Sequence, residues 1–476
     1  MTRVRIPLGR SFGKGRSSAA GMQSLVNMYA EQVENEGRTD VVCYPSPGKA
    51  LFATIGGGIP RGAITAAGIQ YEVIGTRFYK ISSGGVSTDL GEIEGSKMVD
   101  MTFNGVQLSI VAELKSYAYD TISLILAEIS DPNFEQAGTC ASLNSYDAFG
   151  VLGTGRFRWR LVNTATFSAN DFATAEAESD NLRCIRKVGN ELALLGDTSL
   201  EWWYSTGDSG ANAFAKTSTA AKPIGCVSRD AVNVVDGGLT FVGRDGTAGG
   251  VSVYRAEGYE PRKISNPQVD GYLETVSDLT TLNSFTYQQR GHLFYVLRSP
   301  SEWALAWDVS TNQWSYRKSG LFSMGADPLG GWDAVTFALN GSKQIVGASD
   351  GNLYELQVDT YTEAGAGIIR EVTTPQYHKD GKRLFVRRVE LDIEAGVGLT
   401  TGQGSAPIVM MSMSYDGGKT WTNPREASMG AIGQYKFRAA WGAGGSGRKV
   451  MFKFRVSDPV KVVFLGCFAD IMVGAH

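Results

Sequence analysis

Three stretches of this chain decide its fold class: IQYEVIGTRFYKI at residues 69–81, ELALLGDTSLEWWY at 191–204 and HLFYVLRSPSEWALAWD at 292–308. In each one, an apolar strand is followed by a turn marked by Gly, Asp or Ser, and then by a second strand that carries an aromatic side chain. Apolar runs on both sides of such a turn are typical of an antiparallel β-hairpin. The sequence therefore predicts an all-β chain built from repeated hairpins.

The same hairpin unit recurs along most of the chain. A four-stranded propeller blade takes about 40–50 residues, and packing such sheets in a circle buries both faces of each one. The spacing predicts a β-propeller over residues 57–365, with seven blades favoured and six as the alternative. A meander of unrelated hairpins in one or two sandwiches is the competing interpretation. Successive aromatic anchors are 40, 40, 44, 51, 53 and 47 residues apart, at Tyr79, Tyr119, Trp159, Trp203, Tyr254, Trp307 and Tyr354.

The two flanks of the predicted propeller differ from it in pattern. Residues 1–56 are predicted to be an N-terminal arm that closes the propeller or docks on a partner, with residues 39–55 supplying the closing strand. The best candidate for a helix is AAGMQSLVNMYAEQV at residues 19–33. After residue 366, five alternating strands separated by Gly or Asp turns predict a C-terminal β-sandwich or jelly roll over residues 366–476.

Composition excludes several classes of protein. A formal net charge of −3 argues against a sheath that grips nucleic acid, which needs clustered Lys and Arg, and suits a channel through which DNA slides. The five cysteines are widely spaced and are predicted to be free, buried thiols made in a reducing cytoplasm. No apolar run is long enough to span a bilayer, and no signal segment is expected. No catalytic residue, cofactor site or metal site is predicted, because the characteristic spacings are absent.

Residues 414–421, SYDGGKTW, match the Asp-box pattern SxDxGxTW. The pattern predicts a structural turn in which a carboxylate accepts hydrogen bonds from turn amides and an aromatic ring packs beneath the loop. It resembles the Asp-boxes of sialidases and related propeller hydrolases, in which the box is a fold element. A sugar site is the alternative. The residues concerned are Ser414, Asp416, Gly418, Thr420 and Trp421.

Two basic segments are candidate contact surfaces. Arg156, Arg158 and Arg160 alternate with apolar residues, which on a strand places three guanidinium groups on one face. We expect a ladder facing a partner or DNA, with a solvated outer face as the alternative.

The first 16 residues contain five basic side chains and no acid, which indicates either an arm folded onto an acidic neighbouring subunit or an unstructured terminus. These five are Arg3, Arg5, Arg10, Lys14 and Arg16.

The N-terminal stretches SLVNMYAEQVENEG (24–37) and YPSPGKALFATIGGGIPRGAI (44–64) resemble the packaged-DNA-stabilisation proteins of short-tailed Salmonella-type bacteriophages, also called tail hub or nozzle proteins or tail accessory factors. The resemblance continues through the glycine-rich middle to SDP at 457–459, so it covers nearly the whole chain. The residues that carry it are Asn27, Tyr29, Glu31, Pro45, Pro47, Gly48, Arg61 and Gly62. The candidate assembly contacts among them are Asn27, Tyr29, Glu31, Pro47, Gly48 and Arg61.

The resemblance implies a structural, non-enzymatic role without a cofactor. It implies a homo-hexameric ring in the virion, made in the host bacterial cytoplasm and placed below the portal and its adaptor ring. Tailspikes attach at the side of such a ring and a tail needle plugs its end. Double-stranded DNA is retained after packaging and later passes through the lumen without sequence recognition.

Two other functions fit a propeller. A virion-associated propeller that binds or cleaves glycans would require converging carboxylates with perturbed pKa values in a central pocket. A cytoplasmic scaffold propeller would bind peptides on its top face and stay monomeric.

Overall fold

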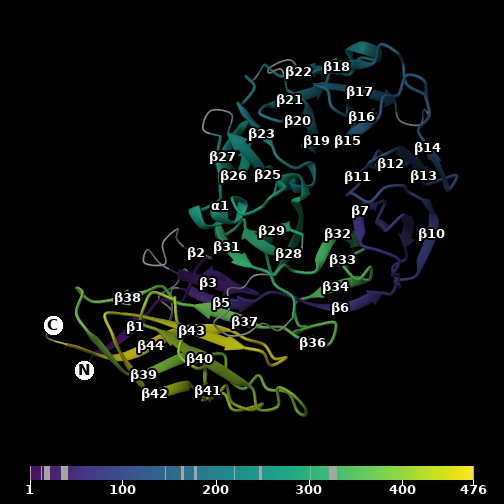
Figure 1. Cartoon of the computed structure of the whole chain (residues 1–476). Helices are drawn as coiled ribbons and strands as arrows, with labels where there is room; N and C mark the ends of the chain where they lie inside the picture. The colour runs from purple at the N-terminus through teal and green to yellow at the C-terminus, as the bar shows by residue number, and fades with distance from the viewer. Residues whose placement is uncertain are drawn as a thin grey trace.

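The computed structural model of the chain (Figure 1) describes residues 2–11, 13–14, 22–33, 41–144, 146–161, 164, 166–175, 180–218, 220–245, 249–300, 302–320 and 330–474. Strands joined by short turns dominate these ranges, and the one α-helix within them is α1 (Pro267–Leu273). This helix begins after Asn266, whose side chain accepts hydrogen bonds from two backbone N–H groups of the first turn. In the same ranges no helix has the length and apolar character needed to cross a membrane.

Four antiparallel sheets of four strands follow one another along the chain, and we number them sheets 1 to 4. In each sheet the strands pair in chain order. Sheet 1 contains β7 (Pro60–Ala66), β8 (Ile69–Ile74), β9 (Arg77–Ile81) and β10 (Ser87–Glu92). Sheet 2 contains β11 (Asp100–Phe103), β12 (Gln107–Val111), β13 (Ser116–Asp120) and β14 (Ile125–Glu128). Sheet 3 contains β15 (Ala137–Leu143), β16 (Tyr146–Val151), β17 (Arg156–Leu161) and β18 (Phe172–Thr174), and sheet 4 contains β19 (Leu182–Val188), β20 (Glu191–Gly196), β21 (Leu200–Ser205) and β22 (Phe214–Lys216).

Three further sheets continue this series as sheets 5 to 7. Sheet 5 contains β23 (Ile224–Cys226), β25 (Gly238–Asp245), β26 (Val251–Glu257) and β27 (Glu260–Lys263), with the short β24 (Asn233–Val235) also paired to β25. Sheet 6 contains β28 (Asn283–Gln289), β29 (His292–Ser299), β30 (Trp303–Asp308) and β31 (Gln313–Tyr316). Sheet 7 contains β32 (Ala334–Asn340), β33 (Lys343–Ala348), β34 (Leu353–Gln357) and β6 (Gly48–Ala53), and the short β35 (Thr362–Glu363) and β36 (Ala366–Gly367) extend it.

The seven sheets lie in a ring, as Figure 1 shows. Apolar cores fill the spaces between neighbours because each strand alternates its side chains between the two faces of its sheet. Between sheets 1 and 2, for example, Tyr71, Phe78 and Tyr119 are buried with ring centroids 5.5–5.8 Å apart. The favoured count of seven blades stays a prediction, and this order of sheets supports it.

The ring is completed by a strand from near the N-terminus. β6 pairs antiparallel with β34, so the fourth strand of sheet 7 precedes sheet 1 in the chain. Sheet 7 in turn lies against sheet 1, where the Thr65 hydroxyl donates to the carbonyl oxygen of Leu339 at 2.7 Å. Residues 39–55 were expected to supply the closing strand, and only β6 within them does so. The preceding strand, β5 (Val41–Pro45), lies in another sheet.

The remaining strands form two facing sheets around a common apolar core that contains Leu391, Met411, Phe454 and Phe464. One sheet contains β1 (Thr2–Ile6), β4 (Met28–Gln32), β5, β39 (Leu384–Ile393), β42 (Ala439–Gly447) and β44 (Phe464–Val473). The other contains β2 (Gly13–Lys14), β3 (Met22–Val26), β37 (Arg370–Thr373), β38 (Tyr377–His378), β40 (Ile408–Ser414), β41 (Arg425–Ser428) and β43 (Lys449–Val456). The two sheets make a β-sandwich that includes N-terminal as well as C-terminal strands.

The propeller and the sandwich share one continuous sheet. β3 pairs antiparallel with β37 of the sandwich, and it pairs in parallel with β31 of sheet 6 through Val26 and Tyr316. Figure 1 shows both chain termini at the sandwich, where β1 pairs with β44. The boundaries at residues 56 and 366 stay predictions, and β1, β4 and β5 belong to the sandwich although they precede the first boundary.

The expected helix at residues 19–33 is wrong for its described part. Residues 22–33 form β3 and β4, separated by Asn27 with φ of 54°. The apolar residues of this stretch fit a helix, but β3 gains β37 and β31 as pairing partners, and β4 gains β5. Tertiary pairing outweighs a weak helical preference of this kind.

The basic N-terminal residues are partly accounted for within the same chain. Arg3 lies in β1, its guanidinium is 3.0 Å from the Glu390 carboxylate, and it also lies over the Phe468 ring. β2, which includes Lys14, pairs with β3. Arg16 lies outside the described residues. The described part of the arm therefore folds onto its own sandwich.

Candidate functional site

Asn27 joins three parts of the chain. Its side-chain nitrogen donates to the carbonyl oxygens of Lys318 and Ile369, at 2.9 Å each, and its side-chain oxygen accepts from the backbone N–H of Lys318 at 3.0 Å. Lys318 follows sheet 6, and Ile369 precedes β37 of the sandwich. Asparagine tolerates the left-handed backbone conformation found here better than most residues do. The buried Asn27 side chain is thus a fully bonded joint between propeller and sandwich.

Tyr29 and Glu31 lie beside a histidine of sheet 6. The Tyr29 ring centroid is 4.9 Å from that of His292 and 5.5 Å from that of Phe294. The His292 ring has one nitrogen 2.8 Å from Asp308 and the other 3.7 Å from Glu31. The hydrogen bond to Asp308, helped by the charge of Glu31, raises the pKa of His292 above its usual value. This cluster fastens β4 to β29 and β30 of sheet 6.

Pro47 and Gly48 direct the chain into the last sheet of the ring. The Pro47 carbonyl oxygen accepts a hydrogen bond from Arg317 at 3.1 Å, and the Gly48 N–H donates to Thr360 at 2.9 Å. A Cβ atom at position 48 would overlap the carbonyl oxygens of Thr360 and Thr362. Glycine is therefore required here by the close approach of two backbones.

Arg61 ties sheet 1 to the loop that leads into sheet 2. Its guanidinium donates to four carbonyl oxygens at 2.7–3.1 Å, those of Lys97, Gly75, Ile93 and Glu94. The residue is 3% exposed, and burial lowers the pKa of its side chain. Four neutral carbonyl oxygens hold this guanidinium group in place, so Arg61 stabilises the fold of its own chain.

The expectation that the family-motif residues are assembly contacts stays a prediction, and burial argues against it for most of them. Asn27, Tyr29, Pro47, Gly48 and Arg61 are buried within their own chain, where hydrogen bonds and packing occupy them. Glu31 differs, because 47% of its side chain is exposed. The motif marks a joint inside the subunit.

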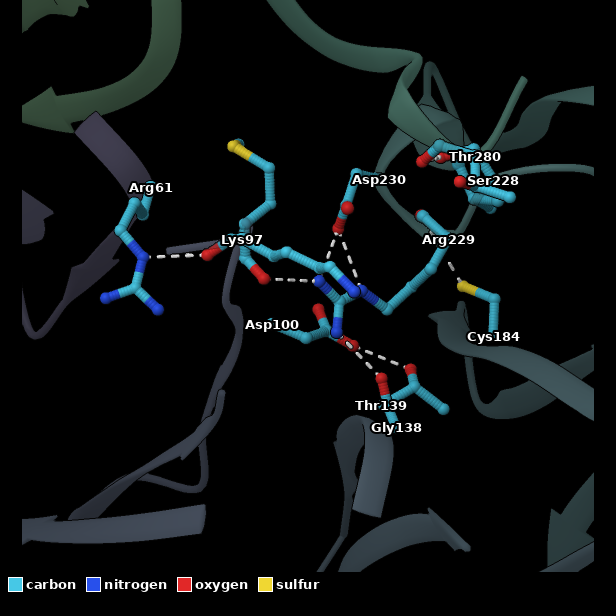
Figure 2. A network of polar contacts seen from close by, with 12 residues as sticks. Arg61, Lys97, Asp100, Gly138, Thr139, Cys184, Ser228, Arg229, Asp230 and Thr280 are labelled. Carbon is cyan, nitrogen blue, oxygen red and sulfur yellow. Dashed lines mark hydrogen bonds and ion pairs between the residues drawn. The ribbon is translucent and has the colours of Figure 1, made fainter. Parts of the chain in front are cut away.

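A cavity of about 930 Å³ opens between sheets 1 to 5, on the face where their first strands begin. Charged side chains of both signs line it, among them Lys97, Glu113, Arg183 and Arg229. Figure 2 shows Arg61, Lys97, Arg229 and Asp230 around this space. No sequence pattern predicts this cavity, since its lining comes from turns far apart in the chain.

Arg229 lines this cavity and connects three sheets. It follows β23 of sheet 5, and its two terminal nitrogens donate to the carbonyl oxygens of Gly138 in sheet 3 and Met98 before sheet 2, at 2.7 Å each. Asp230 accepts from its Nε at 2.8 Å. These contacts, drawn in Figure 2, hold loops of sheets 2, 3 and 5 together.

Asp100 is the acidic centre of the same network. It accepts hydrogen bonds from Thr139 at 2.6 Å, from the backbone of Cys140 at 3.0 Å and from Arg186 at 2.9 Å. Burial alone would raise its pKa, but the charges of Arg186 and Arg229 outweigh burial and lower the pKa. The carboxylate is held ionised, which suits a structural ion network better than proton transfer.

A carboxyl group with a raised pKa is found elsewhere. Glu72 is fully buried, and desolvation raises its pKa to about 7 despite hydrogen bonds from Thr336 and Gln70. It lies at the contact between sheets 1 and 7 and does not line the cavity. Two carboxyl groups that line the cavity, Glu113 and Asp278, have lowered pKa values because of hydrogen bonds from Lys97 and Thr280, whereas the acid of a glycan-cleaving pair needs a raised pKa.

The expected basic ladder stays a prediction, and burial argues against it for two of its three members. Arg158 and Arg160 are 7% and 3% exposed. Arg158 bonds to Glu135 at 2.9 Å and to loop carbonyl oxygens, while Arg160 bonds to Ser109 at 3.2 Å. Both lie where sheet 3 meets sheet 2 or its own loops, so neither the exposed ladder nor a solvated outer face describes them. Arg156 keeps 40% of its side chain exposed beside Glu135.

The Asp-box-like segment forms a hydrogen-bonded turn after β40 of the sandwich. Asp416 accepts from the backbone N–H groups of Lys419 and Thr420 at 2.9 and 3.0 Å, and from the Thr420 hydroxyl at 2.6 Å. The Ser414 hydroxyl donates to Asp416 and accepts from the Gly418 N–H, both at 2.8 Å. The Trp421 indole donates to the carbonyl oxygen of Gly418 at 3.1 Å.

This turn keeps its carboxylate charged. Burial raises the pKa of Asp416, but hydrogen bonds from Thr420, Ser414 and Lys419 outweigh that effect and lower the pKa to about 2. A carboxylate whose oxygens are used by its own turn has little capacity left for a ligand. Among the described residues, no group of three or more His, Cys, Asp and Glu is arranged to hold a metal ion.

Two protein-family models match the chain. One, described as Bacteriophage P22 Gp10, beta-propeller, matches residues 5–361, and the other, described as Bacteriophage P22 Gp10, beta-sandwich, matches residues 369–472. A search of curated proteins finds no match.

Several solved structures have a similar arrangement of strands. The designed protein Ika8 is 10% identical over 65% of this chain and 100% of its own, with a TM-score of 0.40. PorZ, a surface component of the type-IX secretion system of Porphyromonas gingivalis, is 14% identical over 80% of this chain and 46% of its own, with a TM-score of 0.37. The N-terminal domain of Nup159 is 10% identical over 70% of this chain and 99% of its own, with a TM-score of 0.41. Likenesses this distant carry no argument about function.

The family models match in the same order as the ring of sheets and the sandwich. The predicted fold class, a β-propeller followed by a C-terminal β-sandwich, is confirmed, and so is the resemblance to phage DNA-stabilisation proteins. The chain therefore belongs to the family of bacteriophage P22 Gp10, the structural phage tail proteins that stabilise packaged DNA.

Proposed function

We propose that the chain is a non-enzymatic subunit of a homo-hexameric ring in a short phage tail, placed below the portal and its adaptor ring. The ring retains packaged DNA, carries tailspikes and the tail needle, and becomes the conduit through which DNA leaves. Its localisation is the virion, after synthesis in the host cytoplasm. Family membership supports the tail and the DNA-stabilising role, and the finer assignments rest on the resemblance stated above.

The observation that carries the proposal is the continuous sheet through β3. A part that holds DNA under pressure must transmit force between its domains without a hinge. Backbone hydrogen bonds run from sheet 6 through β3 into β37, and Asn27 adds side-chain bonds at the same place. Such a joint resists bending far better than a flexible linker does.

The hydrogen bonds of Arg229 in the propeller cavity support a further detail. Arg229 lines that cavity and links sheet 5 to sheet 3 and to the segment before sheet 2. DNA is therefore proposed to pass through a lumen formed between subunits, and not through the axis of one propeller. With a net charge of −3, we expect this lumen to be mixed or acidic in sign and to let the duplex slide.

The test uses phage particles made with and without this chain. Particles that lack it should package DNA and then lose it, which is measured as a fall in nuclease-protected DNA. Restoring the full-length chain should restore protection. Images of intact particles with this chain labelled should place the label between the adaptor ring and the needle. If particles without the chain retain their DNA, the proposed DNA-retaining role is wrong. If the isolated ring captures duplex DNA in a salt-sensitive way, the proposal that DNA slides through the lumen is wrong.

A further inference from the structure

The turn between β13 and β14 in sheet 2 exposes a cluster of large apolar side chains. Ile122, Leu124 and Ile125, which we call the hairpin knob, are 78%, 59% and 61% exposed. Clustered apolar side chains with this exposure mark protein contact sites more often than scattered ones do. The knob lies in the ring of sheets on the side away from the sandwich (Figure 1).

The hairpin knob is held in one conformation. The Asp120 carboxylate accepts hydrogen bonds from the backbone N–H groups of Ile122 and Ser123 at 2.9 and 2.8 Å. Leu124 has φ of 61°, an unfavourable conformation for a leucine. Strain of this kind persists where the surrounding structure fixes it, often at sites of contact. A preformed knob loses little entropy on binding.

A second apolar cluster lies on a loop of the sandwich, before β42. Ile432, Tyr435 and Phe437, which we call the sandwich knob, are 56%, 76% and 38% exposed. This loop is also anchored, since the Gly433 N–H donates to Gly396 at 3.3 Å and the Gln434 side chain accepts from the backbone N–H of Ala431 at 3.0 Å. Exposed tyrosine and phenylalanine are typical of interface centres.

The two knobs lie in segments of opposite charge. Residues 116–155, which contain the hairpin knob, include no Lys or Arg, and Asp120 and Asp131 lie on either side of it. Two further acids nearby, Glu128 and Glu135, are paired with Lys115 and with Arg156 and Arg158. Residues 427–457, which contain the sandwich knob, include no Asp or Glu, and Lys436 adjoins Tyr435 within it. Complementary charge at the rim of an apolar contact sets its orientation and speeds its formation.

We propose that the hairpin knob of one subunit docks on the sandwich knob of the next copy of this chain, and that this contact builds the ring. A ring of identical subunits needs a head-to-tail contact between two different surfaces of the same chain. The chain presents two such surfaces, one on sheet 2 and one on the sandwich, with apolar centres and opposite charges. This inference rests on the proposed function, because it names the surfaces through which that ring assembles.

The test is cross-linking between two full-length variants, Ile122→Cys and Tyr435→Cys. The five native thiols are buried and do not compete for a bismaleimide reagent under native conditions. Mixed at high concentration, the two variants should give covalent dimers in about tenfold higher yield than either variant alone, because a head-to-tail contact never brings two identical knobs together. A chain carrying both substitutions should give a ladder of larger products, and added salt should lower every yield.

The matched control replaces the hairpin partner with Val86→Cys, a similarly exposed apolar position of sheet 1 outside the knob. Its mixture with Tyr435→Cys should give no more dimer than Tyr435→Cys alone. Equal yields in the single-variant and mixed samples would overturn the proposal. If sedimentation of the unmodified chain reveals a ring while the Ile122 and Tyr435 mixture gives no dimer, this contact is wrong and the ring stands. Loss of the DNA-retaining role is judged separately, by particles that lack the chain.

Discussion

The side-chain nitrogen of Asn27 lies 2.9 Å from the carbonyl oxygen of Ile369, and this hydrogen bond joins the N-terminal part of the chain to the residue just before β37 of the sandwich. The same nitrogen donates to Lys318 at the end of sheet 6. One buried side chain thus fixes the position of the sandwich on the propeller. Because its partners are backbone atoms, another side chain of the same size can replace it only if it offers the same donors and acceptor.

Asn27→Gly should lower the free energy of unfolding by about 3 kcal/mol, because three buried side-chain hydrogen bonds are lost at about 1 kcal/mol each. Glycine keeps the left-handed backbone, so the change isolates the side-chain bonds. Denaturant unfolding of the full chain measures the effect. The matched control is Asn144→Gly, at an exposed position with φ of 54°. Equal effects at the two positions would show that Asn27 acts only through its backbone conformation.

Gly48→Ala should destabilise the chain, because the added Cβ overlaps the carbonyl oxygens of Thr360 and Thr362 and displaces β6 from sheet 7. We expect a loss of about 2 kcal/mol or more, in the range of an overpacked core site. The control is Gly271→Ala in α1, where a Cβ meets nothing within 4 Å and alanine favours the helix. Thermal unfolding should move in opposite directions for the two variants. A neutral Gly48→Ala would mean that the ring does not depend on a tight β6.

Glu72 should make stability fall as pH rises from about 4.5 to about 7. Its pKa is raised from 4.5 to about 7 in the folded chain, so within this window the folded chain holds a proton that the unfolded chain has released. Above pH 7 the cost is complete and amounts to at most about 3 kcal/mol. Glu72→Gln keeps the size and hydrogen-bonding atoms, and it should flatten the profile and stabilise the chain above pH 7. Parallel profiles for the two chains would contradict the assignment.

Asp416→Ala should destabilise the sandwich turn by about 1 kcal/mol, since the carboxylate is exposed and solvent weakens its contribution. The pKa of Asp416 is lowered from 3.8 to about 2, so its contribution is complete above pH 3.8 and is lost as pH falls toward 2. Asp416→Asn should recover most of the loss at neutral pH, because an amide oxygen can still accept from the turn N–H groups. If alanine and asparagine behave alike, these acceptor bonds do not hold the turn.

The five cysteines should be unreactive toward a thiol reagent in the folded chain, and all five should react in denaturant. Each is buried, and burial raises the pKa of every one of these thiols, to about 12 for Cys43 and Cys184. A thiol that stays protonated and shielded is a poor nucleophile. Reaction of one or more thiols at native pH would show that a strand carrying it opens easily.

The strands of this protein could be predicted because their signal is local. A run such as residues 69–81 alternates apolar side chains around a glycine turn, and the structure has β8 and β9 there. The five strands expected after residue 366 correspond to β39, β40, β42, β43 and β44. The Asp-box-like turn is local too, since its hydrogen bonds join residues that are at most four positions apart.

Contacts between distant parts of the chain could not be predicted in this way. Residues 22–33 resembled a helix because helical and extended amphipathic patterns overlap in short segments. Arg158 and Arg160 resembled an exposed ladder because the loops and the sheet that cover them come from elsewhere in the chain. The motif residues Asn27 and Arg61 were identified, but their bonds to Ile369 and to the sheet 2 loop depend on the folded backbone.

The sequence by itself determined the all-β class, the repeated hairpins and the change of pattern near residue 366, because side-chain alternation and turn residues act over a few positions. Only the tertiary structure decided that β6 closes the ring, that β3 joins propeller to sandwich, and that Arg229 bonds to Gly138 and Met98 at the cavity. The physical reason is that strand pairing and buried hydrogen bonds depend on which backbones meet, and partners hundreds of residues apart leave no periodic trace in the sequence.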